Sequence, residues 1–183
     1  MPNRQDEFER VAIPHSRSLL RVARRLAQDR GVADDLVQEA LLSAWRGFDR
    51  FQPGTNAKAW LFRILLNAFY ARGRRLRSRP LTIELDTAEQ TAHGAFSVAS
   101  SQNEAAEITS ALGKLSAEHR TVLLLAVIEG FTCQEVAGIV GLPIGTVMSR
   151  LSRARQALRE NLSPRESSRE ALRANAACAA KQA

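Results

Sequence analysis

The sequence predicts an all-α protein: two small helical domains joined by a flexible linker, the C-terminal one a helix-turn-helix. Apolar residues recur at helical spacing through most of the chain, and no segment alternates as a strand would. The stretch 80–103 contains no Lys or Arg and is rich in Ser, Thr and Ala, as expected of a linker. The predicted divisions are residues 1–79, 80–103, 104–162 and a C-terminal tail at 163–183.

Three helices are predicted in the first domain. The first spans 6–28, and Gly31 is expected to interrupt the helical pattern before a second helix runs from about Ala33 to Phe48. FQPGTN at 51–56 contains Pro and Gly and predicts a loop, with Asn56 as the N-cap of a third helix. That helix ends in five arginines before a proline: Arg72, Arg74, Arg75, Arg77 and Arg79.

Four helices are predicted in the second domain, at about 104–113, 116–129, 132–140 and 143–162, with a Gly-Leu-Pro turn before the last. An apolar stripe on the last helix is made by Val147, Leu151, Ala154 and Leu158. The opposite side carries Ser149, Ser152, Arg153 and Gln156. Hydroxyls and arginines on such a helix suit the DNA major groove. A merely solvated amphipathic helix is the alternative, but the preceding helix, the turn and the arginine density favour DNA binding.

The composition and the residue types indicate which partners, cofactors and functions to expect. The net charge of +7 favours a polyanionic partner. Cys133 and Cys178 are far apart and the three histidines are scattered, so neither a disulfide framework nor a metal site is expected, and no other cofactor. A polar N-terminus and short apolar runs predict a cytoplasmic protein without membrane insertion. Without a phosphate loop or nucleophile motif, an enzyme is not expected.

Two surfaces of the first domain are candidates for binding. Leu42 lies among the polar residues Asp35, Gln38, Glu39 and Arg46 of the second helix. It is either an ordinary exposed leucine or part of an acidic docking patch for a basic protein. On the third helix, one strip carries two rings, two amides and two cations: Asn56, Trp60, Arg63, Asn67, Tyr70 and Arg74. Each ring alone could belong to the core, but the whole strip beside five arginines favours a surface for single-stranded nucleic acid.

Three segments resemble the extracytoplasmic-function (ECF, group IV) sigma factors of bacterial RNA polymerase: ADDLVQEALLSAW (33–45), NAKAWLFRILLNAFYARGRR (56–75) and EGFTCQEVAGIVGLPIGTVMSRLSRAR (129–155). The resemblance covers roughly residues 6–162. It implies an alternative sigma factor that binds core RNA polymerase and promoter DNA, with an anti-sigma factor as a further partner. PGTN-x-x-AWLF is also similar to the general-stress branch of alphaproteobacteria, so a stress response is expected.

The resemblance also assigns roles. Polymerase docking falls to Asp34, Asp35, Gln38, Glu39 and Leu42. The loop 51–56 and the strip from Asn56 to Arg74 correspond to the part that captures unpaired bases of the minus-ten element, and Asn67 matches an asparagine beside a flipped-out base. The minus-thirty-five element is expected to contact Thr146, Met148, Ser149, Arg150, Ser152 and Arg153. Met148 departs from the basic residue of some relatives. A stand-alone helix-turn-helix regulator is the alternative function, but it accounts only for residues 104–162.

Overall fold

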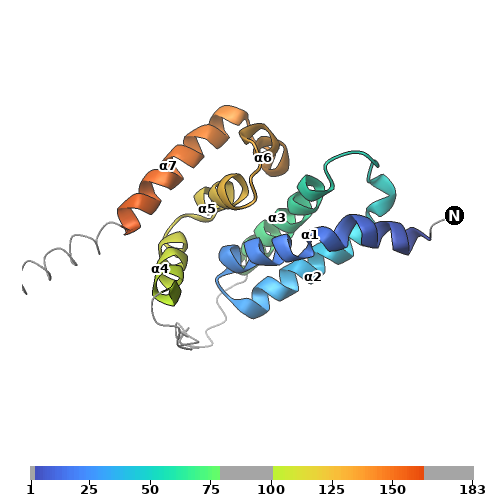
Figure 1. Ribbon diagram of the computed structural model, residues 1–183, viewed down its shortest axis with the longest axis horizontal. Coiled ribbons are helices and arrows are strands. Elements are labelled where there is room, and N and C mark those ends of the chain that lie inside the picture. The colour runs from blue at the N-terminus through green and yellow to red at the C-terminus, as the bar shows by residue number, and fades with distance from the viewer. Residues whose placement is uncertain (1–2, 79–100, 163–183) are drawn as a thin grey trace, which may run out of the picture. The chain divides into compact units, whose positions relative to one another are not determined.

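The structure, a computed structural model, describes residues 3–78 and 101–162, and within these ranges it contains helices and no strand. The chain separates into two compact units, one within residues 1–99 and one within 100–183 (Figure 1). The predicted all-α fold is therefore confirmed. Most of the predicted linker and all of the predicted tail lie outside the described residues.

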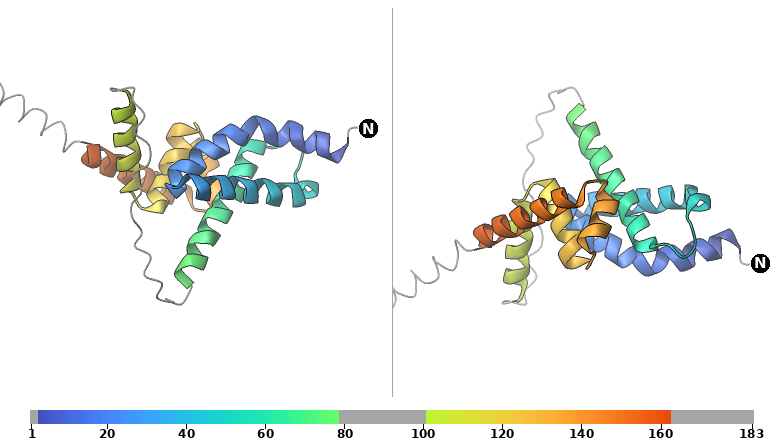
Figure 2. Two further views of the ribbon diagram at one scale, coloured as in Figure 1. Left: turned by 90° about the horizontal axis from the view of Figure 1, so that it is seen from below. Right: turned by 90° about the horizontal axis from the view of Figure 1, so that it is seen from above.

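The first unit contains three long helices and one short 3-10 helix: α1 (Arg4–Ala27), α2 (Arg30–Arg46), η1 (Phe48–Arg50) and α3 (Ala57–Ser78). α1 and α2 run antiparallel, and α3 crosses and contacts both (Figure 2). The apolar stripes of the three helices meet in a core whose largest fully buried side chains include Leu19, Leu36, Leu61, Phe62 and Leu65. This packing fixes which faces of α2 and α3 remain exposed.

The break between α1 and α2 falls earlier than predicted. Gln28 adopts a left-handed conformation (φ 62°) and ends α1. Asp29 then caps the next helix, because its Oδ1 accepts a hydrogen bond from the Val32 N–H at 2.7 Å. α2 consequently begins at Arg30, and the prediction that Gly31 interrupts the helical pattern is wrong. A side-chain cap at the right position outweighs the helix-weakening effect of one glycine.

The segment between α2 and α3 follows the prediction more closely. α2 ends at Arg46, and Phe48 lies in η1 rather than at the end of α2. The loop 51–56 contains Gly54 in a left-handed conformation (φ 87°). The predicted N-cap is confirmed, because Asn56 Oδ1 accepts a hydrogen bond from the Ala59 N–H at 3.0 Å.

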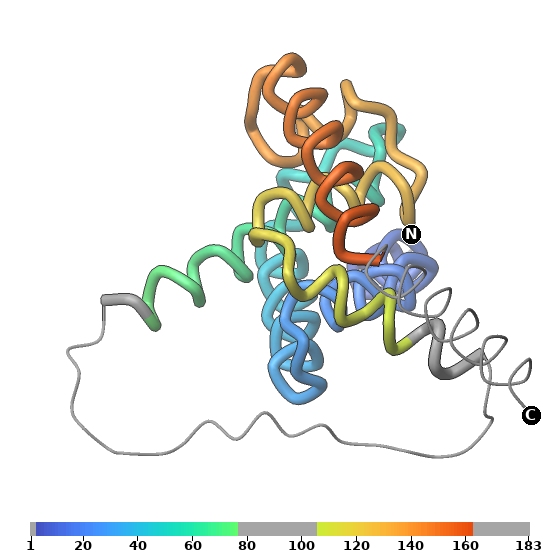
Figure 3. The backbone as a smooth tube through the Cα atoms, turned by 90° about the vertical axis from the view of Figure 1, so that its left-hand side faces the viewer, coloured from blue at the N-terminus to red at the C-terminus, as the bar shows by residue number. Residues whose placement is uncertain are grey.

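The second unit contains α4 (Ser101–Gly113), α5 (Ala117–Leu123), the π-helix η2 (Leu124–Ile128), α6 (Cys133–Val140) and α7 (Ile144–Leu162). α7 lies against α4, α5 and α6 (Figure 3). The helix predicted over 116–129 changes geometry midway. The Glu129 N–H reaches back five residues to the Leu124 carbonyl at 3.1 Å, and the wider turn keeps Leu124 and Leu125 buried.

The turn between α6 and α7 has the chemistry of a helix-turn-helix. Thr132 and Glu135 form a capping box that starts α6, with hydrogen bonds in both directions. α6 ends at Gly141 in a left-handed conformation (φ 69°), and its N–H donates to the Ala137 carbonyl at 2.9 Å. Pro143 then provides the carbonyl that accepts the N–H of Val147. These caps hold α7 in a fixed direction relative to α6.

Arg120 supports the start of the second unit from inside. The side chain is buried, and its Nη2 donates to the carbonyls of Gly113 at 2.8 Å and Leu115 at 2.9 Å. Gly113 is the last residue of α4 and Leu115 follows it, at a helix end that leaves acceptors unsatisfied. Burial lowers the pKa of the Arg120 guanidinium below its ordinary value. The arginine therefore joins α5 to the end of α4.

Candidate nucleic-acid and protein interfaces

The α7 face that the sequence analysis assigned to DNA is largely exposed. We call Thr146, Met148, Ser149, Arg150, Ser152 and Arg153 the α7 reading face. The stripe Val147, Leu151 and Ala154 is buried against the rest of the unit, which leaves Ser149, Ser152 and Arg153 on the outside. Met148 is 56% exposed, so an apolar side chain stands among the polar groups of this face. This arrangement can present two hydroxyls and a guanidinium to base edges.

Arg150 is placed differently from the rest of the α7 reading face. It lies beside the buried stripe, and its Nη2 is 2.8 Å from Glu118 Oε2 on α5. The side chain of Arg150 is only 25% exposed. The ion pair directs this arginine toward its own domain, which its spacing in the sequence did not reveal.

A second exposed row on α7 was missed by the sequence analysis. Arg155 and Arg159 line a depression of about 320 Å³ together with Met148, Ser152 and Cys133 of α6. The two arginines are four residues apart, so they lie one above the other on the helix. Their spacing in the sequence was the available signal. They stand beside the α7 reading face and add positive charge at its edge.

The strip on α3 is partly exposed and partly packed. We call Asn56, Trp60, Arg63, Asn67, Tyr70 and Arg74 the α3 strip. Arg63, Asn67 and Arg74 are exposed, whereas Trp60 and Tyr70 are half-buried. The Tyr70 ring packs edge-on against Phe69, with centroids 5.3 Å apart. The strip thus presents polar groups outward and keeps each ring supported on one side.

Trp60 is held by the residues that lead into the loop 51–56. Its ring centroid lies 4.9 Å from that of Phe51 and 6.5 Å from that of Phe48. The two interpretations of Trp60, core residue and base-stacking residue, are therefore compatible. One part of the ring packs inside, and the remainder is accessible beside the loop.

The arginines at the end of α3 do not share one direction. Arg74 is exposed on the α3 strip, whereas Arg72 lies on the other side of the helix. Arg72 Nη1 is 3.7 Å from Asp35 Oδ2 on α2. Arg72 therefore has a carboxylate of α2 as its near neighbour, and contact of the arginine run with phosphates stays a prediction.

The polar face of α2 forms one side of a groove. We call Asp34, Asp35, Gln38, Glu39 and Leu42 the α2 patch. All five residues are exposed, and Asp34 Oδ1 lies 3.7 Å from Arg24 Nη2 of α1. Gln38 and Leu42 line a mostly apolar groove of about 680 Å³ between α1 and α2, into which Ile13 of α1 also faces. Leu42 is 56% and Ile13 61% exposed, so the leucine belongs to a continuous apolar surface rather than standing alone.

Among residues 3–78 and 101–162, no helix has both the length and the apolar character needed to cross a bilayer.

Two family models match the two units in turn. Residues 13–79 match the family described as Sigma-70 region 2, and residues 105–158 match Sigma-70, region 4. The first match contains the α2 patch and the α3 strip, and the second contains the helix-turn-helix. The fold and these two matches therefore define an RNA polymerase sigma factor.

Similar proteins show which group of sigma factors the chain belongs to. The chain is 38% identical over 155 residues to the ECF RNA polymerase sigma factor EcfG of Rhodopseudomonas palustris (strain TIE-1), a match that covers 81% of this chain and 79% of the relative. The chain belongs to the extracytoplasmic-function sigma factors of RNA polymerase.

Solved structures agree in fold. The sigma factor RpoE of Bartonella quintana, solved with the anti-sigma factor NepR, is 34% identical with a TM-score of 0.67, covering 85% of this chain and 96% of that one. CnrH of Cupriavidus metallidurans, solved with the cytosolic domain of CnrY, is 30% identical with a TM-score of 0.65, covering 87% and 90%. Both similarities extend over the two units.

Proposed function

We propose that this chain is a non-enzymatic, alternative sigma factor that binds core RNA polymerase in the cytoplasm and directs transcription from specific promoters, in a stress response. One observation carries the proposal. The two units, matched separately to region 2 and region 4, each keep a different binding surface exposed on a packed helical core. A single duplex-binding regulator would need only the second unit.

The α2 patch is our candidate for the polymerase contact. Its carboxylates suit a basic partner, and Leu42 with Ile13 offers apolar area that a helix of the partner would bury. Because Asp34 and Asp35 are exposed and each lies 3.7 Å from its arginine, these pairs are weak and a partner cation can replace them.

The α3 strip and the loop 51–56 are our candidates for the minus-ten element. The half-buried ring of Trp60 can stack on an unpaired base, and the exposed amide of Asn67 can hydrogen-bond to a flipped-out one. Arg63 and Arg74 stand along the same strip and can hold phosphates. Binding energy gained on open strands lowers the cost of melting the duplex.

The α7 reading face is our candidate for the minus-thirty-five element in the major groove. Ser149 and Arg153 have the exposed positions needed for base contacts, while Arg155 and Arg159 extend the basic edge toward the phosphates. Two linked contacts on one promoter raise the effective concentration of the second once the first has formed.

An anti-sigma factor is a further proposed partner. RpoE of Bartonella quintana was solved with the anti-sigma factor NepR and CnrH with the cytosolic domain of CnrY, and both resemble this chain across the two units. An inhibitor that covers the α2 patch would prevent polymerase binding without altering the DNA-binding surfaces themselves.

A reconstituted transcription assay tests the proposal. The purified chain, mixed with core RNA polymerase, should produce transcripts from promoters selected by sequencing the RNA that its overexpression induces. Core polymerase alone is the control. If the chain binds those promoters as duplex DNA but neither joins the core enzyme nor supports transcription, a stand-alone regulator is the correct function.

A further inference from the structure

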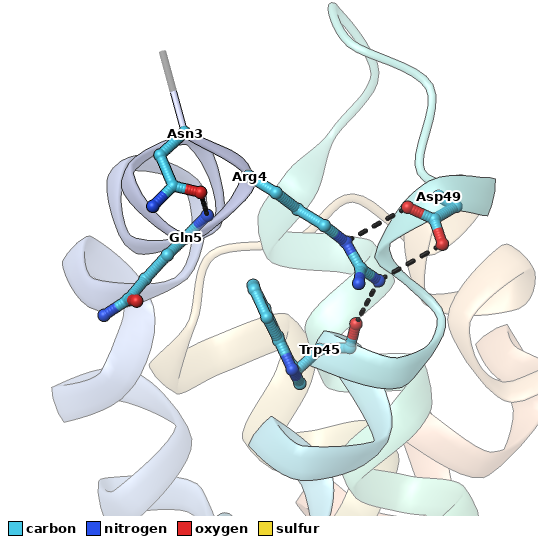
Figure 4. Close-up of polar contacts among 5 residues, drawn as sticks. All are labelled: Asn3, Arg4, Gln5, Trp45 and Asp49. Carbon is cyan, nitrogen blue, oxygen red and sulfur yellow. Dashed lines mark hydrogen bonds and ion pairs between the residues drawn. The ribbon is translucent and has the colours of Figure 1, made fainter.

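A cluster at the start of α1 holds the chain segment that leads into the loop 51–56 (Figure 4). Arg4 Nη2 donates to the Trp45 carbonyl at 3.1 Å and to Asp49 Oδ2 at 3.2 Å, while Arg4 Nε lies 3.1 Å from Asp49 Oδ1. The guanidinium carbon is also 4.6 Å from the centroid of the Trp45 ring. We call Arg4, Trp45 and Asp49 the Arg4 clamp. It joins the first residue of α1 to the last turn of α2 and to η1.

The position of Arg4 is unfavourable for its own helix. The N-terminal end of a helix carries partial positive charge, so an acid is favoured there and a cation is not. Asp6 and Glu7 in the first turn of α1 follow this rule, and Arg4 does not. Any stabilisation by Arg4 therefore comes from its contacts with α2 and η1, and these contacts join α1 to the chain that follows α2.

A row of aromatic rings leads from the clamp to the far side of the loop. Successive ring centroids are 5.3 Å apart from Trp45 to Phe8, 5.3 Å from Phe8 to Phe48, 5.9 Å from Phe48 to Phe51 and 4.9 Å from Phe51 to Trp60. Phe51 begins the loop, and Trp60 lies in the first turn of α3 just after it. Both ends of the loop are thus attached to the same row of rings.

We propose that Arg4 and Asp49 are positioning residues that hold the loop 51–56 and Trp60 in the arrangement needed to receive an unpaired DNA strand. This role rests on the proposed function of the loop and the α3 strip. An exposed loop that is ordered before binding avoids the entropy cost of ordering it on the DNA. The clamp supplies that order from the protein side, without itself touching the strand.

Hydrogen exchange of the full chain tests whether the Arg4 clamp orders the loop 51–56. Arg4→Ala and Asp49→Ala should speed amide exchange in residues 51–56 by about twofold to tenfold, the range expected from losing an exposed ion pair and a cation–π contact. Arg10→Ala is the matched control, because this α1 arginine donates to the Asp6 carbonyl of its own helix. Arg4→Lys keeps the charge and should fall between Arg4→Ala and the unaltered chain. Unchanged exchange in the loop overturns the inference.

Promoter opening by the reconstituted holoenzyme tests whether the Arg4 clamp helps the protein to receive an unpaired DNA strand. Arg4→Ala and Asp49→Ala should each reduce the formation of open complex by a similar factor, measured by permanganate reactivity of unpaired thymines. Binding to core polymerase should not change, and the double variant should lose no more than the worse single one. Circular dichroism of each variant reports whether the helices remain folded.

The outcomes separate this inference from the proposed function. Faster loop exchange with unchanged opening means that the clamp orders a loop that captures no bases, which overturns the positioning role. If the unaltered chain fails to join core polymerase, the proposed function fails, and the positioning role in base capture fails with it. The exchange data would then still show whether the clamp orders the loop.

Discussion

Arg150 and Glu118 form the ion pair that joins α7 to α5, with 2.8 Å between Nη2 and Oε2. Glu118 is 57% exposed, so the pair is partly screened by water. A double-mutant cycle with Arg150→Ala and Glu118→Ala should give a coupling in the free energy of unfolding of about 0.5–1 kcal/mol. Denaturant unfolding of the second unit measures it. Additive losses would show that the pair contributes nothing.

The same pair should affect DNA binding. Because Glu118 neutralises much of its charge, Arg150→Ala should weaken binding to minus-thirty-five DNA less than Arg153→Ala does. Glu118→Ala should not weaken it at all.

Arg153 is the arginine best placed for a base contact. It is exposed on the side of α7 opposite the buried stripe, so its removal should leave the fold intact. Arg153→Ala should weaken binding to the preferred duplex by about 1–3 kcal/mol. Arg153→Lys keeps the charge but loses the planar fork, so most of the loss should remain if the contact is to a base. If lysine restores the affinity, Arg153 contacts a phosphate instead.

Asn67 should act during promoter opening. Its amide is exposed on the α3 strip, and a flipped base would supply its hydrogen-bond partner. Asn67→Ala should reduce open-complex formation by about tenfold, corresponding to one or two lost hydrogen bonds. The affinity for core polymerase, measured by fluorescence anisotropy, should stay the same. Equal losses in both assays would assign Asn67 a structural role.

The fold was predictable because local signals in this chain agree with its packing. The Asn56 cap, the glycine-proline turn before α7 and the apolar stripes all specify helices by neighbouring residues alone. The errors occur where two local signals compete. Asp29 caps α2, so that Gly31 lies within the helix. The helix predicted over 116–129 becomes a π-helix at Leu124–Ile128, which the apolar spacing did not indicate.

The surfaces were less predictable, because they depend on contacts between helices. The family resemblance placed Arg150 near DNA, and the arginine run at the end of α3 did the same for Arg72, but each lies beside a carboxylate of another helix. Helical projection showed Leu42 as an isolated leucine. The packing of α1 on α2 brings Ile13 to the same groove, and the sequence of either helix alone does not indicate this contact.

His15 should make the stability of the first unit depend on pH. Burial, followed by the positive charge of Lys58, lowers the pKa of its imidazole below the ordinary value of 6.5. The unfolded chain therefore takes up a proton at a higher pH than the folded one, so the free energy of unfolding should fall as pH drops through that value. Well above that value the imidazole is neutral in both the folded and the unfolded chain, so the free energy of unfolding no longer depends on pH through His15. Denaturant unfolding of the unaltered chain and of His15→Gln measures the difference, and a difference that does not change with pH would contradict the expectation.

Leu42 should contribute to polymerase binding without contributing to stability. More than half of its side chain is exposed, so Leu42→Ala removes little buried area within the chain. In a complex that fills the groove, the same side chain would be buried, and its truncation should weaken binding to core polymerase by about 1–2 kcal/mol. Leu76 of α3 is 62% exposed and lies outside the groove, which makes Leu76→Ala the matched control. Equal affinities of the two variants for the core enzyme would remove Leu42 from the interface and leave the acidic residues of the α2 patch to account for docking.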